Sequence, residues 1–268
     1  MFGLLFETCI VCKNTDINEK ASKGPLSDAD TFRITAGADS KDFKRMAFIV
    51  NHIHVDTMLK TPSYLFIAVM LVTVLSMASQ KNKVSLFDGK TFNGWEGDTT
   101  KTWKIQDGAI VGGSLVETVP HNSFLCTRKT YSNFILNVKF KLTGHEGFIN
   151  TGVQFHSVRS KDPSYEMIGY QADLGAKFWG SLYDESRRNK TLIAPDSVEV
   201  LKLVKLNDWN DYQVWSENGR IRIALNGKQT VDYTEPDKSV PQQGIIGLQI
   251  HGGGKAKVYY KDIFIEEL

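Results

Sequence analysis

The chain has 268 residues, of which 23% are charged and 41% hydrophobic, and its formal net charge is +2. This balance is that of an ordinary globular protein, and it excludes the strongly basic surface that nucleic-acid binding requires. Aromatic residues make up 11% of the chain, and 22 glycines stand against seven prolines, which favours a β-rich domain with many tight turns over a helical bundle.

Residues 1–57 have no sustained hydrophobic period, and the stretch NTDINEKASKGPLSDADT within them is typical of polar coil. We expect this segment to be a disordered extension or the product of a mis-assigned start, with Met58 as the true first residue. Cys9 and Cys12 form a C-x-x-C pair, but no second pair follows at zinc-site spacing. A metal or redox role for this pair is therefore not expected.

Residues 58–78 have the layout of a secretory signal. A methionine and Lys60 precede the apolar run YLFIAVMLVTVLSMA, which ends in the small residues Ser76 and Ala78. The run is short for a bilayer crossing, which typically takes about 20 residues. We expect cleavage after Ala78 and export to the periplasm or the outside of the cell. The alternative is a retained type II anchor, and only then is a membrane a partner.

From Val84 to Leu268 the chain reads as short strands separated by turn signals, with no helical period of useful length. TWKIQDGAIVGG predicts a hairpin through Asp107-Gly108, and RIRIALNGKQTVDY predicts another through Asn226-Gly227. FLCTR predicts a strand in which the thiol of Cys126 is buried. Strands at this spacing, without helices to cover a parallel sheet, predict an all-β, two-sheet antiparallel sandwich.

Several of these strands have polar residues opposite their apolar face. NTGVQFHS, YQADL, WGSLYDESR and GIIGLQIHGG alternate with a period of two, which places the second set of side chains together on the reverse face. That set contains Asn150, Gln154, His156, Gln171, Asp173, Trp179, Tyr183, Glu185, Gln249 and His251. Amides and carboxylates bond to hydroxyl groups and aromatic rings stack on sugars, so neighbouring strands of this kind would form a sugar-binding floor.

The motifs LFDGKTFNGW, WKIQDGAIVG, NTGVQFHS, GYQAD, GSLYDESRR, WNDYQVWSENGRIRIALNG and GIIGLQIHGG follow one another in this order. Together they resemble the DUF1080 domain, also called the 3-keto-disaccharide hydrolase domain, from about Val84 to Leu268. The resemblance implies a jelly roll similar to concanavalin A-like lectins and glucanases, export in bacteria, and action on sugars oxidised to a ketone at C3. The E-x-D-x-(x)-E motif of ordinary glucanases is absent, so a double-displacement glycosidase is not expected.

A ketone at C3 acidifies the proton on C2, so the bond at C1 can break by elimination, after which water adds to the enone. This route needs a base, a stabiliser for the enolate oxygen and an acid for the departing oxygen. A divalent metal ion is one candidate for the stabiliser. We assign proton transfer or metal ligation to Asp173, Glu185, His156 and His251. We assign substrate binding to Asn150, Gln154, Gln171, Trp179 and Gln249, with Tyr183, Arg187 and Arg188 near the rim.

Plainer alternatives stand beside these assignments. Each histidine can be a satisfied surface or core imidazole, and Asp173 or Glu185 can be a solvated charge or pair with Arg187 or Arg188. The whole domain can also be a carbohydrate-binding module without catalysis, because fold does not decide function. The expected partners are a sugar substrate and a sugar oxidoreductase that supplies the keto sugar.

Overall fold

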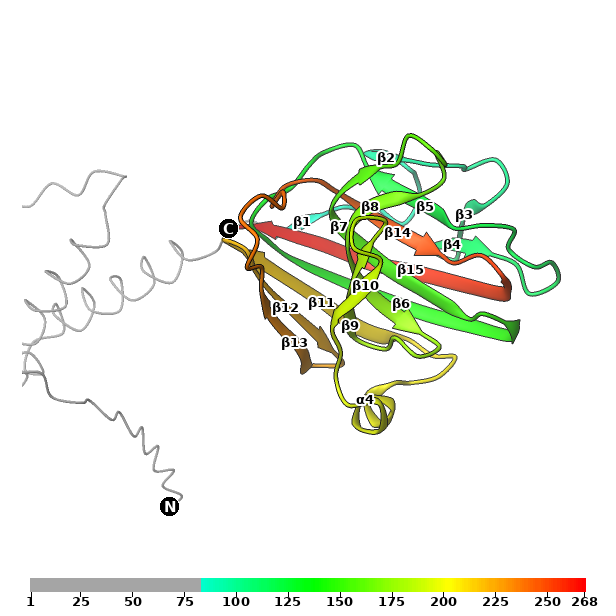
Figure 1. The fold of residues 1–268 in the computed structure, drawn as a ribbon. Helices are drawn as coiled ribbons and strands as arrows, with labels where there is room; N and C mark the ends of the chain where they lie inside the picture. The colour runs from blue at the N-terminus through cyan, green and yellow to red at the C-terminus, as the bar shows by residue number, and fades with distance from the viewer. Residues whose placement is uncertain (1–82) are drawn as a thin grey trace, which may run out of the picture. The chain divides into compact units, whose positions relative to one another are not determined.

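Two antiparallel sheets pack face to face in the computed structural model, which describes residues 83–268 (Figure 1). The expected all-β sandwich is therefore confirmed. Sheet A has the strand order β13-β12-β11-β6-β15-β4-β3, with β1 beside β15, and sheet B has the order β10-β9-β8-β7-β14-β5-β2. The expectations for residues 1–57 and for the signal segment at 58–78 lie outside the described residues.

The strands of sheet A are β1 (Val84–Ser85), β3 (Trp103–Gln106), β4 (Ala109–Gly113), β6 (Phe134–Gly147), β11 (Asn210–Glu217), β12 (Arg220–Leu225), β13 (Lys228–Thr234) and β15 (Gly254–Glu267). Those of sheet B are β2 (Trp95–Glu96), β5 (Ser123–Thr127), β7 (Asn150–Arg159), β8 (Met167–Gly175), β9 (Ser181–Glu185), β10 (Lys190–Ile193) and β14 (Ile245–Ile250). Within this part of the chain the one helix is α4 (Ser197–Leu203).

The core lies between the sheets and follows the alternation in the sequence. In β6, Phe134, Leu136, Val138 and Phe140 are buried while the residues between them are partly exposed. Burying each large apolar side chain contributes roughly 1.5–3 kcal/mol. A polar contact also joins the sheets, because the Tyr260 hydroxyl of β15 lies 2.6 Å from Thr151 Oγ1 of β7. This contact joins β7 of sheet B to β15 of sheet A across the core.

Both expected hairpin turns are confirmed. Asp107 and Gly108 have φ of 51° and 73°, and Asn226 and Gly227 have φ of 49° and 80°, as turns with two left-handed residues require. Helix α4 was not expected. Its N-cap Asp196 accepts hydrogen bonds from the backbone N–H groups of Val198 and Glu199, and its 7 residues are too few for a helical hydrophobic period to stand out in the sequence.

A β-bulge interrupts the alternation of β7. The register with β8 shifts between Phe155 and Val158, and His156 has the left-handed φ of 45°. Gly169 of β8 accommodates the displaced Ser157, because a Cβ at Gly169 would lie 2.1 Å from Ser157 Oγ. The bulge therefore turns Ser157 outward and His156 inward, and it bends the end of β7.

The described residues settle two smaller points. Cys126 is fully buried, as expected, and burial raises the pKa of its thiol to about 12, which makes it unreactive at neutral pH. Across residues 83–268, no helix has the length and apolar character needed to cross a membrane.

Candidate active site

One row of side chains crosses the outer face of sheet B at Asp173. Asp173 of β8 pairs with Gly152 of β7 on one side and with Ser181 of β9 on the other. In β14, Leu248 pairs with Val153, so the next residue, Gln249, lies opposite Gly152. Strands are about 4.8 Å apart, which places the backbones of Gln249 and Asp173 about 10 Å from each other. We call Gln249, Gly152, Asp173 and Ser181 the Asp173 row.

Asp173 is buried, with an exposed fraction of 4%. Its Oδ1 accepts hydrogen bonds from Asn150 Nδ2 at 2.9 Å and from the backbone N–H of Leu174 at 2.8 Å. Burial nevertheless raises the pKa of this carboxyl to about 7, because the ionised form loses more solvation than these donors return. At neutral pH, Asp173 can therefore both accept and release a proton.

The neighbouring row contains two amides that are joined by a hydrogen bond. Gln154 Nε2 donates to Gln171 Oε1 at 3.0 Å, and Ser157 Oγ donates to Gln154 Oε1 at 2.8 Å. Gln171 reaches over Gly152, where an added Cβ would lie 2.7 Å from two of its carbons. Glycine is therefore required at 152 for Gln171 to take this position.

Gln249 differs from these amides. Its exposed fraction is 0%, yet neither its Nε2 nor its Oε1 has a hydrogen-bond partner among the described residues. Leaving a buried amide unpaired costs about 1–3 kcal/mol, so such a group usually has a water or ligand as its partner. Gln249 is thus the side chain of this face whose geometry points most directly to a bound molecule.

A second carboxyl group lies beyond Asp173 on β9. Glu185 pairs with Gly169 and is partly exposed, and burial together with the charge of Glu166 raises its pKa to about 7. Tyr183 stands opposite Gln171, and its pKa is raised by burial and by the charges of Glu185 and Asp173. In the strand register, Tyr183 therefore lies on the same face, one row from Asp173 and one row from Glu185.

Four rings form a continuous arc beside the Asp173 row. His251 meets Phe148 with 4.6 Å between ring centroids, Phe148 meets Phe178 at 6.3 Å, and Phe178 meets Tyr183 at 6.1 Å. We call these residues the aromatic arc. His251 Nδ1 lies 2.7 Å from the Gly252 carbonyl oxygen and so carries a proton, which leaves Nε2 as the acceptor in the neutral ring.

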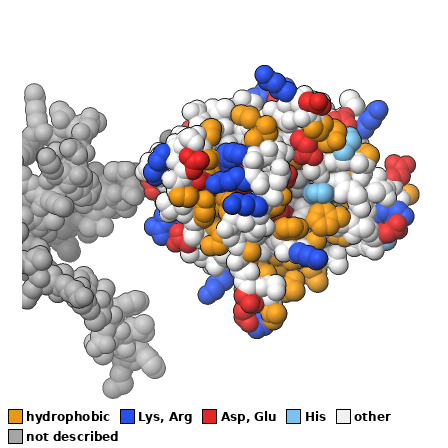
Figure 2. Space-filling view, viewed as in Figure 1, with side chains coloured by type: hydrophobic (Ala, Val, Ile, Leu, Met, Phe, Trp, Pro, Cys, Tyr) orange, Lys and Arg blue, Asp and Glu red, His pale blue; other side chains and the backbone are white. Residues whose placement is uncertain are grey.

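Most of the residues expected on this face are brought together there: Asn150, Gln154, Gln171, Asp173, Tyr183, Glu185, Gln249 and His251. Their roles stay predictions. Histidine, acidic and hydrophobic side chains reach the surface side by side in the space-filling view (Figure 2). Phe148 and Phe178 were missed, because both lie outside the strands and no alternation marks them.

The placement of His156 on this face is wrong. The bulge turns its ring into the interior, where it meets the edges of the Phe134, Phe155 and Tyr170 rings. Its Nε2 lies 2.7 Å from the Ser132 carbonyl oxygen, and burial lowers its pKa to about 4. His156 is therefore a neutral core imidazole with a backbone partner.

Trp179, Arg187 and Arg188 also lie elsewhere. Trp179 packs against Phe140 of sheet A, with 6.3 Å between ring centroids, because the turn after β8 breaks the alternation before β9 begins. Both arginines pair with Asp184, whose side chain points away from the Glu185 face. Arg188 also pairs with Glu235, so these guanidinium groups neutralise buried carboxylates of the interior.

The residues present do not form a metal site. Among residues 83–268, no three histidine, cysteine, aspartate or glutamate side chains lie close enough together to hold an ion. The divalent ion considered as enolate stabiliser thus has no ligand set in this part of the chain.

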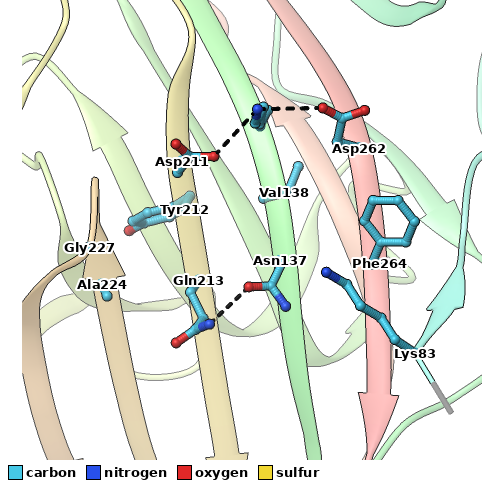
Figure 3. Close-up of a pocket in the computed structure, with 11 residues that line it drawn as sticks. Lys83, Asn137, Val138, Asp211, Tyr212, Gln213, Ala224, Gly227, Asp262 and Phe264 are labelled. Atoms are coloured by element: carbon cyan, nitrogen blue, oxygen red, sulfur yellow. Dashed lines mark hydrogen bonds and ion pairs between the residues drawn. The ribbon is translucent and has the colours of Figure 1, made fainter. Parts of the chain in front are cut away.

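A hollow of about 600 Å³ lies on the outer face of the other sheet (Figure 3). Its polar side chains are already partnered: Gln213 Nε2 donates to Asn137 Oδ1 at 2.8 Å, and Lys139 lies within ion-pair distance of Asp211 and Asp262. This hollow has the character of a solvated sheet face.

A β-sandwich that carries the Asp173 row beside the aromatic arc has groups suited to binding a sugar. Comparison with family models makes this specific: the chain belongs to the family described as 3-keto-alpha-glucoside-1,2-lyase-like domain, which matches residues 82–266. This confirms the resemblance found in the sequence motifs. A search of curated proteins finds no match.

Solved structures of similar fold fit this assignment. A candidate glycosyl hydrolase from Parabacteroides distasonis is 21% identical with a TM-score of 0.51, and the match covers 69% of this chain and 94% of that one. The carbohydrate-binding module CBM66 from Bacillus subtilis is 18% identical with a TM-score of 0.50, covering 65% and 96%. At these identities the likeness shows the fold alone.

Proposed function

We propose that the protein cleaves 3-keto glycosides by elimination across C1 and C2, followed by addition of water. The observation that carries this proposal is the Asp173 row, in which a buried carboxyl group with a pKa of about 7 shares one line with the unpartnered amide of Gln249. The family to which the chain belongs supports the same substrate class.

In this reaction Asp173 is the base. Its Oδ1 is held by Asn150 and Leu174, and the carboxylate takes the proton from C2. The electrons of the C2–H bond become the C1=C2 double bond, while those of the C1–O bond leave with the glycosidic oxygen, which takes a proton from an acid. Gln249 Nε2 donates to the C3 oxygen while that oxygen carries the enolate charge. Addition of water reverses the proton transfers and restores both groups.

The aromatic arc supplies the apolar wall that a sugar ring stacks against. The floor of the row is buried, so binding requires the arc or a neighbouring loop to move aside and then close over the sugar. Closure would also exclude water from the enolate.

The experiment that tests this function incubates the protein with a 3-keto disaccharide in D2O and follows C2 and the released sugar by NMR. Deuterium at C2 and release of monosaccharide are expected, with no reaction of the parent disaccharide. Asp173→Asn should lower turnover by at least about 100-fold. Cleavage by the variant at the wild-type rate would refute Asp173 as the base.

A carbohydrate-binding function without catalysis is the second candidate, and the aromatic arc favours it equally. It predicts that a 3-keto disaccharide binds and is recovered intact, with no exchange at C2. The NMR experiment therefore separates the two functions.

We also propose that the protein is exported after cleavage of residues 58–78, and that an enzyme oxidising the C3 hydroxyl of sugars supplies its substrate. The motivating features are the signal layout in the sequence and the ketone that the chemistry requires. Amino-terminal sequencing of the native protein should begin at residue 79. A sequence beginning within residues 1–57 would reject this processing.

A further inference from the structure

The tip of the β7–β8 hairpin, residues 160–166, folds back over the outer face of sheet B. At its base, the Arg159 guanidinium donates to the carbonyl oxygens of Glu96 at 3.2 Å and Phe124 at 3.4 Å. At its end, Asn122 Nδ2 donates to Glu166 Oε1 at 2.9 Å. Because Asn122 directly precedes β5, the tip is anchored across β5 and β2.

Tyr165 and Glu166 are consecutive in this tip, but their side chains lie in two different surroundings. The Tyr165 ring stacks on His121 with 4.2 Å between centroids and lines a hollow of about 390 Å³. The other polar residues around this hollow include Glu96, Asp98, Thr102 and Arg159. On the other side, Asn122, which donates to Glu166, accepts a hydrogen bond from the backbone N–H of Gly252 at 3.0 Å, so Glu166 lies beside the His251–Gly252 segment of the candidate active site. Glu166 thus stands at the boundary between the two spaces.

The two oxygens of Glu166 are not equivalent. Asn122 donates to Oε1, which must therefore be an acceptor in either protonation state, while Oε2 is buried and has no partner in the described part of the chain. A proton on this carboxyl group consequently lies on Oε2. Burial raises the pKa of Glu166, and the nearby charge of Glu185 opposes ionisation of both groups together.

We propose that Glu166 is the acid that protonates the departing glycosidic oxygen, and that the hollow beyond Tyr165 receives the leaving group. This assignment rests on the proposed function and adds to it a catalytic acid and a subsite for the leaving group. The reacting 3-keto ring lies over the Asp173 row, and the leaving sugar lies against Tyr165 and His121.

The step balances without a further reactant. As the C1–O bond breaks, its electron pair stays on the glycosidic oxygen, which takes the proton from Glu166 Oε2. The products are an enone with a C1=C2 double bond and a free sugar hydroxyl. Glu166 is left as a carboxylate beside C1, where it takes a proton from the water that adds in the second stage.

The test compares two leaving groups. A 3-keto disaccharide loses an alkoxide that needs a proton, whereas a 4-nitrophenyl 3-keto glucoside loses a phenolate that is stable by itself. We expect Glu166→Gln to lower kcat/KM for the disaccharide by at least about 100-fold and to change the nitrophenyl rate by less than about 3-fold. The same variant should still exchange the C2 proton of the disaccharide in D2O, because the base is intact.

Glu146→Gln is the matched control, since this carboxylate near the end of β6 is exposed and pairs with Lys255 of β15 on the surface; both rates should stay unchanged. Tyr165→Ala should raise KM for the disaccharide several-fold and leave the nitrophenyl substrate unaffected. Equal losses on both substrates in Glu166→Gln, or loss of exchange at C2, would overturn this assignment alone. A wild-type protein that cleaves neither substrate would overturn the proposed function and this assignment together.

Discussion

Gln249 and Gln154 are buried glutamines on the same face of sheet B, yet only one of them has its amide satisfied. Gln154 is bonded to Gln171 and Ser157, while Gln249 has no partner among the described residues. A satisfied buried amide stabilises the fold and an unpaired one weakens it. We therefore expect Gln154 to stabilise the fold and Gln249 to bind a ligand.

Replacing each glutamine by leucine should therefore have opposite effects. Gln249→Leu removes an unpaired buried group, so the free energy of unfolding should stay level or rise, while turnover falls by about 100-fold through loss of the enolate donor. Gln154→Leu orphans Gln171 and should lower the free energy of unfolding by about 1–3 kcal/mol. Urea unfolding and turnover measured on the same preparations check both. A Gln249→Leu protein that is destabilised and fully active would contradict this account.

The pH dependence of stability follows from Asp173. Burial raises its pKa from 3.8 to about 7, so the folded protein holds this proton more tightly than the unfolded chain does. The free energy of unfolding should consequently fall as pH rises from about 4 to about 7, by up to about 4 kcal/mol for this group, and then level off.

Glu185 titrates in the same range, because its pKa is raised from 4.5 to about 7. Asp173→Asn should therefore reduce the slope of stability against pH, and the double variant with Glu185→Gln should remove most of it. Urea unfolding at intervals between pH 4 and pH 8 measures these slopes. An unchanged slope in Asp173→Asn would show that this carboxyl group is already ionised in the fold.

Sequence periodicity predicted the features of this fold that depend on regular strand pairing. Phe134 to Phe140 alternate as expected, both hairpin turns are present, and Gln171 and Asp173 face away from the core. A period of two fixes which side chains share a face wherever pairing is regular. It also found most of the candidate site, because that site is built on regular strands.

The same logic failed wherever the backbone leaves the regular strand. His156 is turned inward by a bulge and Trp179 follows a turn, neither of which the apolar pattern encodes. Phe148 and Phe178 reach the site from loops, and the position of Glu166 depends on its hydrogen bond with Asn122. Such contacts join residues distant in sequence, and a single chain carries no signal for them.

The two histidines of the sequence prediction offer a direct comparison. His156 is packed among core rings with its Nε2 on a backbone carbonyl, whereas His251 closes the aromatic arc with its Nε2 free to accept. His156→Leu should lower the melting temperature and leave turnover of the folded protein within about 2-fold. His251→Leu should lower turnover at least about 10-fold with a smaller loss of stability. Turnover per folded molecule checks this prediction, with the folded fraction measured by circular dichroism. A larger loss of turnover in His156→Leu than in His251→Leu would contradict it.

Arg188 should be essential to the fold rather than to the reaction. It pairs with the fully buried Asp184 and, at 2.7 Å, with Glu235, whose side chain is 2% exposed. Arg188→Met leaves both carboxylates without this partner, and breaking a buried pair in this way costs about 3–5 kcal/mol. Adding Glu235→Gln should recover part of this loss, because the amide can still accept from the Tyr170 hydroxyl that now bonds to Glu235.

Arg220 provides the matched control for Arg188. Its pair with Asp232 is also 2.7 Å long but lies on the surface, with side-chain exposures of 51% and 39%. Such exposed pairs contribute about 0–1 kcal/mol, so Arg220→Met should have little effect on unfolding by urea. Turnover measured well below the unfolding transition should be close to wild type in both single variants, because neither arginine faces the Asp173 row. Equal destabilisation by the two substitutions would mean that the interior cluster contributes no more than a surface ion pair.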